Sequence, residues 1–472
     1  MLDLARWQFG ITTVYHFLFV PLSIGLSALV AGFHTAWVRR GGESYRRLTQ
    51  FFGKLLVVNF ALGVVTGLVQ EFQFGMNWSA FSVFVGDVFG VPLALEALLA
   101  FFLESTFLGL WIFGWDRLPR RVHLACIWIV AIGTQLSAYV ILAANSWMQH
   151  PVGYTIDPAT GRVRLTDFVA VLTNSTTVVA YLHTAAASFV TAGAFVAGVA
   201  FWHLARGRQP DAFRRAATAA CAVVLVAGIG VAVSGDAQGK LLTRQQPMKM
   251  AAAEALYRTE KPASFSVLTI GTPDGRKEIW SLRVPYVTSF LATGDPNGEV
   301  RGIDDVQRQY VATYGPGDYV PNVPATYWNF RLMIGFGMTA VAAALGGLLL
   351  LWRSRRRRDD GFVTRHGRWI ARAALALPLL PLLANSAGWV FTETGRQPWL
   401  AFGLFRTADG VSPGVTATQI AISLSAFIAV YAALAVVEVV LLTRIARRGI
   451  DGPPAASDVP EPDTDAPLAL TY

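Results

Sequence analysis

The 472-residue sequence has little charge and almost no cysteine. Charged residues make up 15% of the chain, whereas a soluble domain averages about 25%. Cys126 and Cys221 both lie in apolar runs, which argues against a disulfide framework and a paired-cysteine metal site. The first apolar run is too long for a signal peptide, and Arg39 and Arg40 follow it, so we expect it to be retained. No internal repeat is apparent.

Apolar residues are abundant instead. They form 54% of the chain, and the mean hydropathy is +0.45. These values indicate a protein that crosses a membrane several times. The net charge is +9, from 39 basic and 30 acidic residues. In a membrane protein such an excess usually lies in cytoplasmic loops, so it does not indicate nucleic-acid binding.

Nine apolar runs approach or exceed the roughly 20 residues that cross a bilayer. The predicted fold class is therefore an all-α integral membrane protein with nine transmembrane helices. The runs cover residues 11–37, 53–70, 91–115, 122–144, 176–204, 213–234, 327–352, 369–392 and 417–443.

Basic residues are concentrated in alternate loops. Arginines or lysines are clustered at 39–54, 117–121, 206–215, 353–368 and 444–448, whereas the short second, fourth and eighth loops have few or none. The positive-inside rule then places the N-terminus outside and the C-terminus inside.

Four parts follow from these runs: a six-helix membrane part (1–234), an outer loop (235–326), a three-helix membrane part (327–448) and a tail (449–472). The outer loop contains two alternating segments around Pro273-Asp274-Gly275, which predict a β-hairpin over 265–271 and 278–284. Residues 249–258 predict a short helix. The tail is rich in Pro, Asp and Ala, which predicts disorder.

The third span carries two carboxylates, Glu96 and Glu104. An acid in the hydrocarbon costs about 2.5–3.5 kcal/mol, so it usually faces a protein interior or a water path. On a regular helix the two acids lie roughly 80° apart and about 12 Å apart along the axis. The two acids could be structural, with buried partners, or they could be functional. We favour a functional role, because an acid within a membrane span is usually functional.

Five polar or ligand-type side chains are expected at a similar depth in the membrane. Counted from the outer ends of their spans, a group of side chains is expected in one layer near the outer face: His16, His183, Met333, Glu393 and Glu96. Histidine and methionine are axial ligands of haem iron in cytochromes. Arg331 and Arg396 lie nearby and suit haem propionates. Any one of these residues alone could instead belong to the core.

Several segments together resemble subunit I of the cytochrome bd-type quinol oxidases. The resemblance covers essentially the whole chain, and its most specific segments are FFLEST and GRQPW. The matching blocks are RWQFGITTVYHFLFVPL (6–22), FALGVVTGLVQEFQFGMNWS (60–79), ALEALLAFFLESTFLGLWIFGWDR (94–117), LAANSWMQHP (142–151), YLHTAAASFVTAG (181–193), FRLMIGFG (330–337) and ETGRQPW (393–399).

The resemblance implies roles for matching positions. His183 and Met333 would ligate the low-spin haem b558. His16 and Glu393 would ligate the high-spin haems b595 and d, in an order that stays open, with Glu96 beside them. The remaining implied residues are Glu104 and Ser137 on the proton route, Lys249 and Glu254 at the quinol site, and Arg331, Arg396 and Trp389 near the haems.

The implied function is a terminal respiratory oxidase of the bacterial cytoplasmic membrane. Quinol would be oxidised near the outer face and dioxygen reduced to water with cytoplasmic protons, which generates proton motive force without pumping. Subunit II, and small single-span subunits, would be its membrane partners. The outer loop has only about 90 residues, which resembles the short-loop branch of the family, and the choice between menaquinol and ubiquinol stays open.

Two other interpretations compete. A proton-coupled transporter could use Glu96 and Glu104 as carriers, but inverted repeats and broken helices are not evident, and the His/Met group would be unexplained. A haem subunit that only transfers electrons would need neither His16 nor Glu393. Bound haem d would distinguish the oxidase from both.

Overall fold

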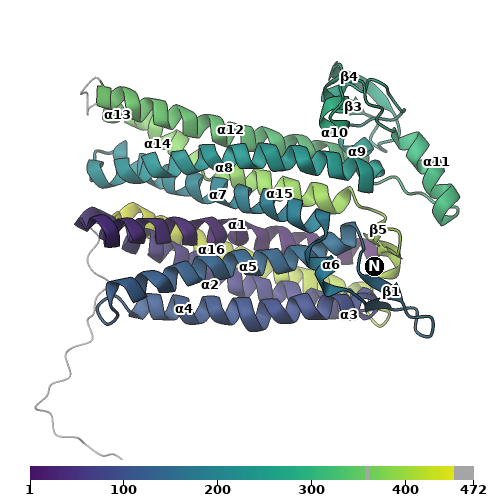
Figure 1. Cartoon of the computed structure of the whole chain (residues 1–472), viewed down its shortest axis with the longest axis horizontal. Coiled ribbons are helices and arrows are strands. Elements are labelled where there is room, and N and C mark those ends of the chain that lie inside the picture. The colour runs from purple at the N-terminus through teal and green to yellow at the C-terminus, as the bar shows by residue number, and fades with distance from the viewer. Residues whose placement is uncertain (357–361, 451–472) are drawn as a thin grey trace, which may run out of the picture.

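The computed structural model describes residues 1–356 and 362–450. Within these residues, nine helical spans are long and apolar enough to cross a membrane, which confirms the predicted number. They run side by side along the long axis of the molecule (Figure 1). The spans are α1 (Leu2–Arg40), α2 (Glu43–Met76), α3–η1–α4 (Ser79–Phe113), α5 (Arg120–Gln149), α6–α7 (Phe168–Leu204), α8 (Pro210–Gln245), α12 (Val323–Arg356), α14–α15 (Gly367–Thr394) and α16 (Ala417–Arg448).

The predicted spans 53–70 and 91–115 left residues 71–90 between them as a loop, and this was wrong. Helix α2 continues to Met76, and α3 (Ser79–Leu95) begins two residues after Asn77. Residues 79–90 are mostly apolar and carry one charged residue, Asp87, so they extend the span rather than interrupt it. As a result Glu96 follows 17 helical residues, instead of lying about five residues from the outer end.

Neighbouring helices approach closely where small residues meet. A Cβ at Gly25 of α1 would lie 2.3 Å from the backbone oxygen of Ser188 on α7 (Ser175–Leu204), so only glycine permits this contact. Small residues at such crossings let membrane helices pack backbone to backbone. The close α1–α7 contact joins two helix pairs, α1 with α2 and α7 with α8, into one bundle.

The sequence at both ends of the last span, α16, explains where this helix begins and ends. Thr416 accepts a hydrogen bond from the backbone N–H of Gln419, and the Gln419 side chain accepts from the backbone N–H of Thr416. This reciprocal capping box satisfies two N–H groups that the first turn leaves unpaired. Arg447 and Arg448 occupy the last turn, where cations are favoured by the helix dipole.

The soluble part between α8 and α12 lies at the same end of the bundle as the N-terminus (Figure 1). It contains α9 (Pro247–Ala253), the strands β3 (Phe265–Gly271) and β4 (Glu278–Val284), α10 (Val287–Thr293) and α11 (Ile303–Tyr314). The predicted hairpin is confirmed as an antiparallel pair. Because α8 continues to Gln245, the soluble part begins eleven residues later than residue 235.

The short helix predicted over 249–258 is only half right. Helix α9 ends at Ala253, and Ala255 has a left-handed φ of 46° that no helix continues. The sequence also missed two small antiparallel pairs, which are β1 (Tyr154–Ile156) with β2 (Val163–Leu165), and β5 (Trp399–Ala401) with β6 (Phe405–Arg406). The predicted tail falls almost wholly on residues 451–472, outside the described residues.

Candidate functional site

Glu96 and Glu104 both face α5. The Ser137 hydroxyl donates a hydrogen bond to Glu96 at 3.0 Å, and a Cβ at Gly133 would lie 2.8 Å from Glu104 Cγ. A π-helical turn, η1 (Glu96–Phe101), separates the two acids before α4 (Phe102–Phe113) begins. Such turns inside α-helices are frequent at functional sites, and this one changes the angle expected between the acids.

Ser137 pairs with Glu96 and not with Glu104, the partner that the family resemblance implied. Glu104 is 7% exposed, and its Oε1 is buried with no hydrogen-bond partner among the described residues. Ser137 and Gly133 are one helical turn apart on α5, so the two carboxylates follow one line along this helix. That line is the arrangement expected of a proton route through the span.

Two histidines have matching surroundings. His16 Nδ1 lies 3.0 Å from the Thr66 hydroxyl on α2, and His183 Nδ1 lies 3.1 Å from the Ser234 hydroxyl on α8. In each case the ring nitrogen that remains is Nε2. A histidine ligand usually has its other ring nitrogen hydrogen-bonded in this way.

Met333 lies on α12 against α15 (Leu379–Thr394). A Cβ at Gly388 would be 2.8 Å from the Met333 sulfur, so the missing side chain gives the thioether its space. Helix α12 also packs against α7 and α8, which carry His183 and its hydroxyl partner. Met333 and His183 therefore belong to one helix cluster, as a shared haem requires.

Glu393 ends α15 among polar partners. It pairs with Arg396, and the Asn145 side chain of α5 donates to its Oε1 at 3.1 Å. Asn145 and Ser137 are eight residues apart on α5, about 12 Å along the axis. Glu96 therefore lies deeper than Glu393, and the expected single layer of five ligands is wrong for Glu96.

Trp389 is the remaining predicted residue on α15. Its ring lies 6.3 Å from the ring of Phe9 on α1, centroid to centroid. Trp389 is one turn from Glu393 on the same helix and contacts the N-terminal part of α1. This position is compatible with an aromatic wall of a cofactor site.

Glu254 follows α9 and is buried, with 2% exposure. Arg331 of α12 donates to its Oε2 at 2.8 Å, and the Ser266 N–H donates to the same oxygen at 3.2 Å. Burial raises the pKa of Glu254, while the Arg331 charge and these hydrogen bonds oppose that shift. The carboxylate can hold a proton more readily than an exposed one.

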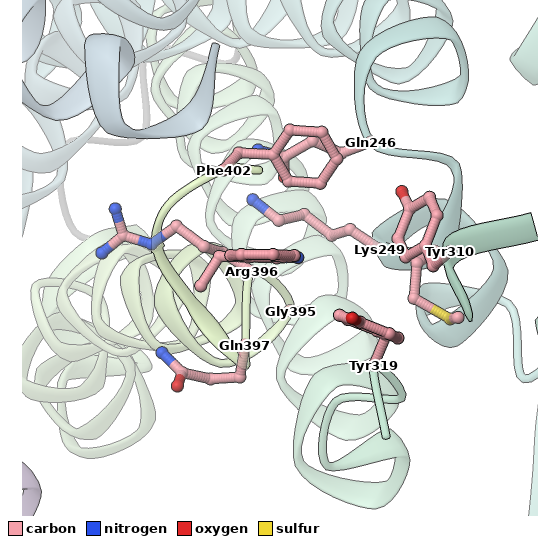
Figure 2. A pocket seen from close by; sticks show the side chains of 10 residues that line it. Gln246, Lys249, Tyr310, Tyr319, Gly395, Arg396, Gln397 and Phe402 are labelled. Carbon is pink, nitrogen blue, oxygen red and sulfur yellow. The ribbon is translucent and has the colours of Figure 1, made fainter. Parts of the chain in front are cut away.

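Lys249 lies on α9 but points to a different environment. It is 4% exposed, and its amine donates to the Gln149 side chain of α5 at 2.6 Å. Figure 2 shows Lys249 crossing a narrow pocket, with the Arg396 guanidinium directed away from it. The pocket is lined by Gln246, Met248, Lys249, Tyr310, Tyr319, Gly395, Arg396, Gln397, Trp399 and Phe402. Lys249 and Glu254 are thus close in sequence but have separate partners.

Burial, together with the nearby Arg396 charge, lowers the pKa of Lys249 to about 7, and Glu393 partly opposes this shift. The Lys249 side chain also fills the space beside Gly395, where a Cβ would lie 2.7 Å from Lys249 Cγ. The amine is therefore coupled electrostatically to the Glu393–Arg396 pair.

This depressed pKa predicts a pH-dependent stability. From pH 7 to about 10, the unfolded chain keeps the lysine proton and the folded chain has lost it, so stability rises with pH; below pH 7 the unfavourable contribution is complete. The slope from this group is about 1.4 kcal/mol per pH unit. We expect Lys249→Met to remove a rise in unfolding temperature between pH 7 and 9.

The matched control is Lys240→Met, since Lys240 pairs with Asp236 nearer the surface. The control should keep the pH dependence of the parent protein in a thermal unfolding series. An unchanged pH dependence in the Lys249 variant would contradict the burial argument.

Several atoms fit a haem group. Arg331 has two guanidinium nitrogens, Nε and Nη1, buried without partners among the described residues, and Arg396 has one, Nε. A propionate is a carboxylate that such nitrogens bind well. Imidazole and thioether groups are also donors that haem iron accepts. In the described part of the chain, no group of three or more His, Cys, Asp or Glu could hold a metal ion, so a bare metal centre has no support.

Comparison with known proteins decides the family. The sequence profile described as cytochrome bd terminal oxidase subunit I matches residues 4–450. The chain belongs to this family. It is 46% identical to cytochrome bd ubiquinol oxidase subunit 1 of Bacillus subtilis over 451 residues, which cover 95% of this chain and 94% of that one.

Two more relatives agree with this assignment. Cytochrome bd-II ubiquinol oxidase subunit 1 of Escherichia coli is 36% identical over 506 residues, covering 95% of this chain and 97% of that one. The bd oxidase structure from Geobacillus thermodenitrificans superimposes with a TM-score of 0.84 at 27% identity, covering 95% of this chain and 98% of that one.

This subunit I is therefore part of a haem-containing terminal respiratory oxidase in a bacterial membrane, with subunit II as its partner. Family membership favours the oxidase over the transporter. Four further residues contact the candidate site residues but had no predicted role: Asn145, Gln149, Thr66 and Ser234. Asn145 and Gln149 lie inside the quoted block 142–151, but their roles depend on helix neighbours that a sequence does not display.

Proposed function

We propose that this quinol:oxygen oxidoreductase oxidises quinol near the outer face and reduces dioxygen to water with protons from the inside. The observation that carries the proposal is the division of polar groups. Glu254 and Lys249 lie in the soluble part at one end of the bundle. Glu96 and Glu104 follow α5 within the membrane. Separate sites for proton release and proton uptake generate proton motive force without a pump.

Sidedness follows from charge. The soluble part lies at the end of the bundle that carries the N-terminus, and α13 (Phe362–Arg365) lies at the opposite end (Figure 1). The basic loop 353–368 includes α13, so the positive-inside rule assigns that end to the cytoplasm. The soluble part then faces outward from the bacterial cytoplasmic membrane, and the C-terminal end of α16 faces the cytoplasm.

Haem would be held by the residues that fit it. His183 and Met333 would ligate the low-spin haem b558, with Arg331 beside a propionate. His16 and Glu393 would each serve one of the high-spin haems, b595 and d, with Trp389 near Glu393 and Arg396 fixing it. Glu96, deeper along α5, would lie on the inner side of these ligands. When bound, these haems supply electron transfer and oxygen reduction. The chain supplies axial ligands, charge compensation and proton carriers.

The proton steps belong to the chain itself. A quinol hydroxyl within reach of Glu254 can give its proton to this buried carboxylate, whose pKa is raised by burial. Arg331 holds Glu254 in place, so proton acceptance next to Arg331 couples the quinol end to the Met333 helix. Lys249 lies in a separate pocket. It would orient the quinol ring or help its protons leave, and it would not share a contact with Glu254.

Proton uptake would follow α5. Glu104 would accept protons from the inner side, and Ser137 would carry them to Glu96. Single-span accessory subunits would cover membrane-exposed surface without entering this route.

The direct test measures oxygen consumption and proton release together in vesicles. The complex with subunit II, reconstituted in one orientation and given a reduced short-chain quinol, should consume oxygen and acidify the side that bears the soluble part. One proton should be released on this side for each electron transferred, which is the number that quinol oxidation alone provides. No additional pumped protons should appear. Oxygen uptake with proton release on the opposite side would contradict the proposed sidedness.

A further inference from the structure

Two helix pairs present their histidines in the same manner. His16 and Thr66 lie on the consecutive helices α1 and α2, and His183 and Ser234 lie on the consecutive helices α7 and α8. The hydroxyl follows its histidine by 50 residues in the first pair and by 51 in the second. The overall sequences of the pairs differ, so this correspondence is visible only in the contacts.

The hydroxyl hydrogen is already committed in both pairs. Ser234 donates to the backbone oxygen of Gly230 at 2.6 Å. Thr66 donates to the backbone oxygens of Leu62 and Gly63, each at 3.0 Å. A hydroxyl has one hydrogen, so while it donates to the preceding turn its oxygen accepts from the imidazole. This arrangement puts the proton on Nδ1 and leaves the lone pair on Nε2.

A glycine follows each hydroxyl residue directly. A Cβ at Gly67 would lie 3.1 Å from His16 Cε1, and a Cβ at Gly235 would lie 3.4 Å from His183 Cε1. The ring edge therefore lies against the bare backbone of the next residue. The hydroxyl sets the tautomer of the ring, and the glycine sets how closely the ring approaches the helix.

We propose that Thr66-Gly67 and Ser234-Gly235 are matched imidazole cradles that hold His16 and His183 with Nε2 presented to haem iron. The inference rests on the proposed ligand roles of these histidines and adds the positioning residues. Because hydrogen bonding of Nδ1–H makes an imidazole a more basic ligand, each cradle also sets the redox potential of its own haem.

The test removes one hydroxyl at a time in the complete complex with subunit II. Ser234→Ala should raise the midpoint potential of the low-spin haem, because a less basic ligand stabilises the ferric state less. We expect about a tenfold change in the redox equilibrium, which is about 59 mV for one electron. Thr66→Val should shift a high-spin haem and leave the low-spin haem unchanged.

Conservative variants separate the hydrogen bond from packing. Ser234→Thr and Thr66→Ser keep a hydroxyl and should restore the parent potentials. Ser188→Ala is the matched control, because Ser188 lies on α7 and its hydroxyl donates to the backbone oxygen of Thr184. This control should leave all potentials unchanged.

The outcomes distinguish the inference from the function beneath it. Loss of haem in Ser234→Ala with recovery in Ser234→Thr would support the cradle, and loss in both would overturn it. An unchanged potential in Ser234→Ala would also overturn it, provided His183→Leu removes the low-spin haem. If His183→Leu keeps that haem, the ligand assignment itself fails.

Discussion

Replacing Met333 with leucine removes the low-spin haem signal while the subunit still folds: this is the first result we expect. Leucine fills nearly the same volume, so α12 should still pack against α15, but it offers no sulfur to iron. The reduced-minus-oxidised spectrum should lose its low-spin b band, and quinol-driven oxygen uptake should fall by about 100-fold or more. His183→Leu should give the same spectrum.

Met338→Leu is the matched control for this change. Met338 lies on the same helix, five residues further along, and is 67% exposed on the outside of the bundle. It should keep the parent spectrum and rate. A Met333→Leu protein that retains its low-spin band would contradict the ligand assignment, whatever its activity.

The second large effect is expected at Glu104. Glu104→Gln keeps the shape of the side chain but cannot carry a proton. Loss of a positioned proton carrier costs about 10²–10⁴-fold in rate, so oxygen uptake should fall by about 100-fold or more. The haem bands should be unchanged, because Glu104 faces Gly133 of α5 and lies a π-turn and several residues away from Glu96.

Glu438→Gln is the control that tests whether replacing any acid within a span slows oxygen uptake as much as Glu104→Gln does. Glu438 lies on α16, near Tyr15 of α1, away from the α5 line. Its replacement should leave the rate near that of the parent. Equal losses in both variants, or altered haem bands in Glu104→Gln, would argue for a structural role of the acids rather than a proton route.

The nine spans were predictable because membrane hydropathy is a strong, local signal. Their ends were less so. Residues 79–90 carry a single acid, Asp87, and the last two turns of α8 are largely polar, apart from Leu241 and Leu242, but still helical. In the first case apolar residues extended a span beyond the predicted boundary. In the second, a helix continued past the apolar run, where hydropathy gives no signal.

Side-chain neighbours were the harder part of the site. Lys249 and Glu254 are five residues apart, which predicts a shared site on one helix. Helix α9 ends between them, and the left-handed turn at Ala255 sends the chain away, so Glu254 meets Arg331 while Lys249 meets Gln149. The position of this turn depends on tertiary packing and not on a glycine in the sequence.

The hydroxyl partners of the histidines could not have been found by pattern alone. Thr66 and Ser234 are ordinary polar residues within apolar helices, where most such side chains bond to the preceding turn. Their second role appears only when α2 lies beside α1 and α8 beside α7. The candidate ligands themselves were visible earlier, because histidine, methionine and glutamate are rare enough in spans to draw attention.

The most direct test of the account is a visible spectrum of the complex with subunit II, reduced minus oxidised, recorded before and after adding carbon monoxide. The account predicts a low-spin b band that carbon monoxide leaves unchanged and a red-shifted chlorin band that it moves. A well-folded complex with b bands alone, or with no haem, would contradict an oxygen-reducing site built on His16 and Glu393.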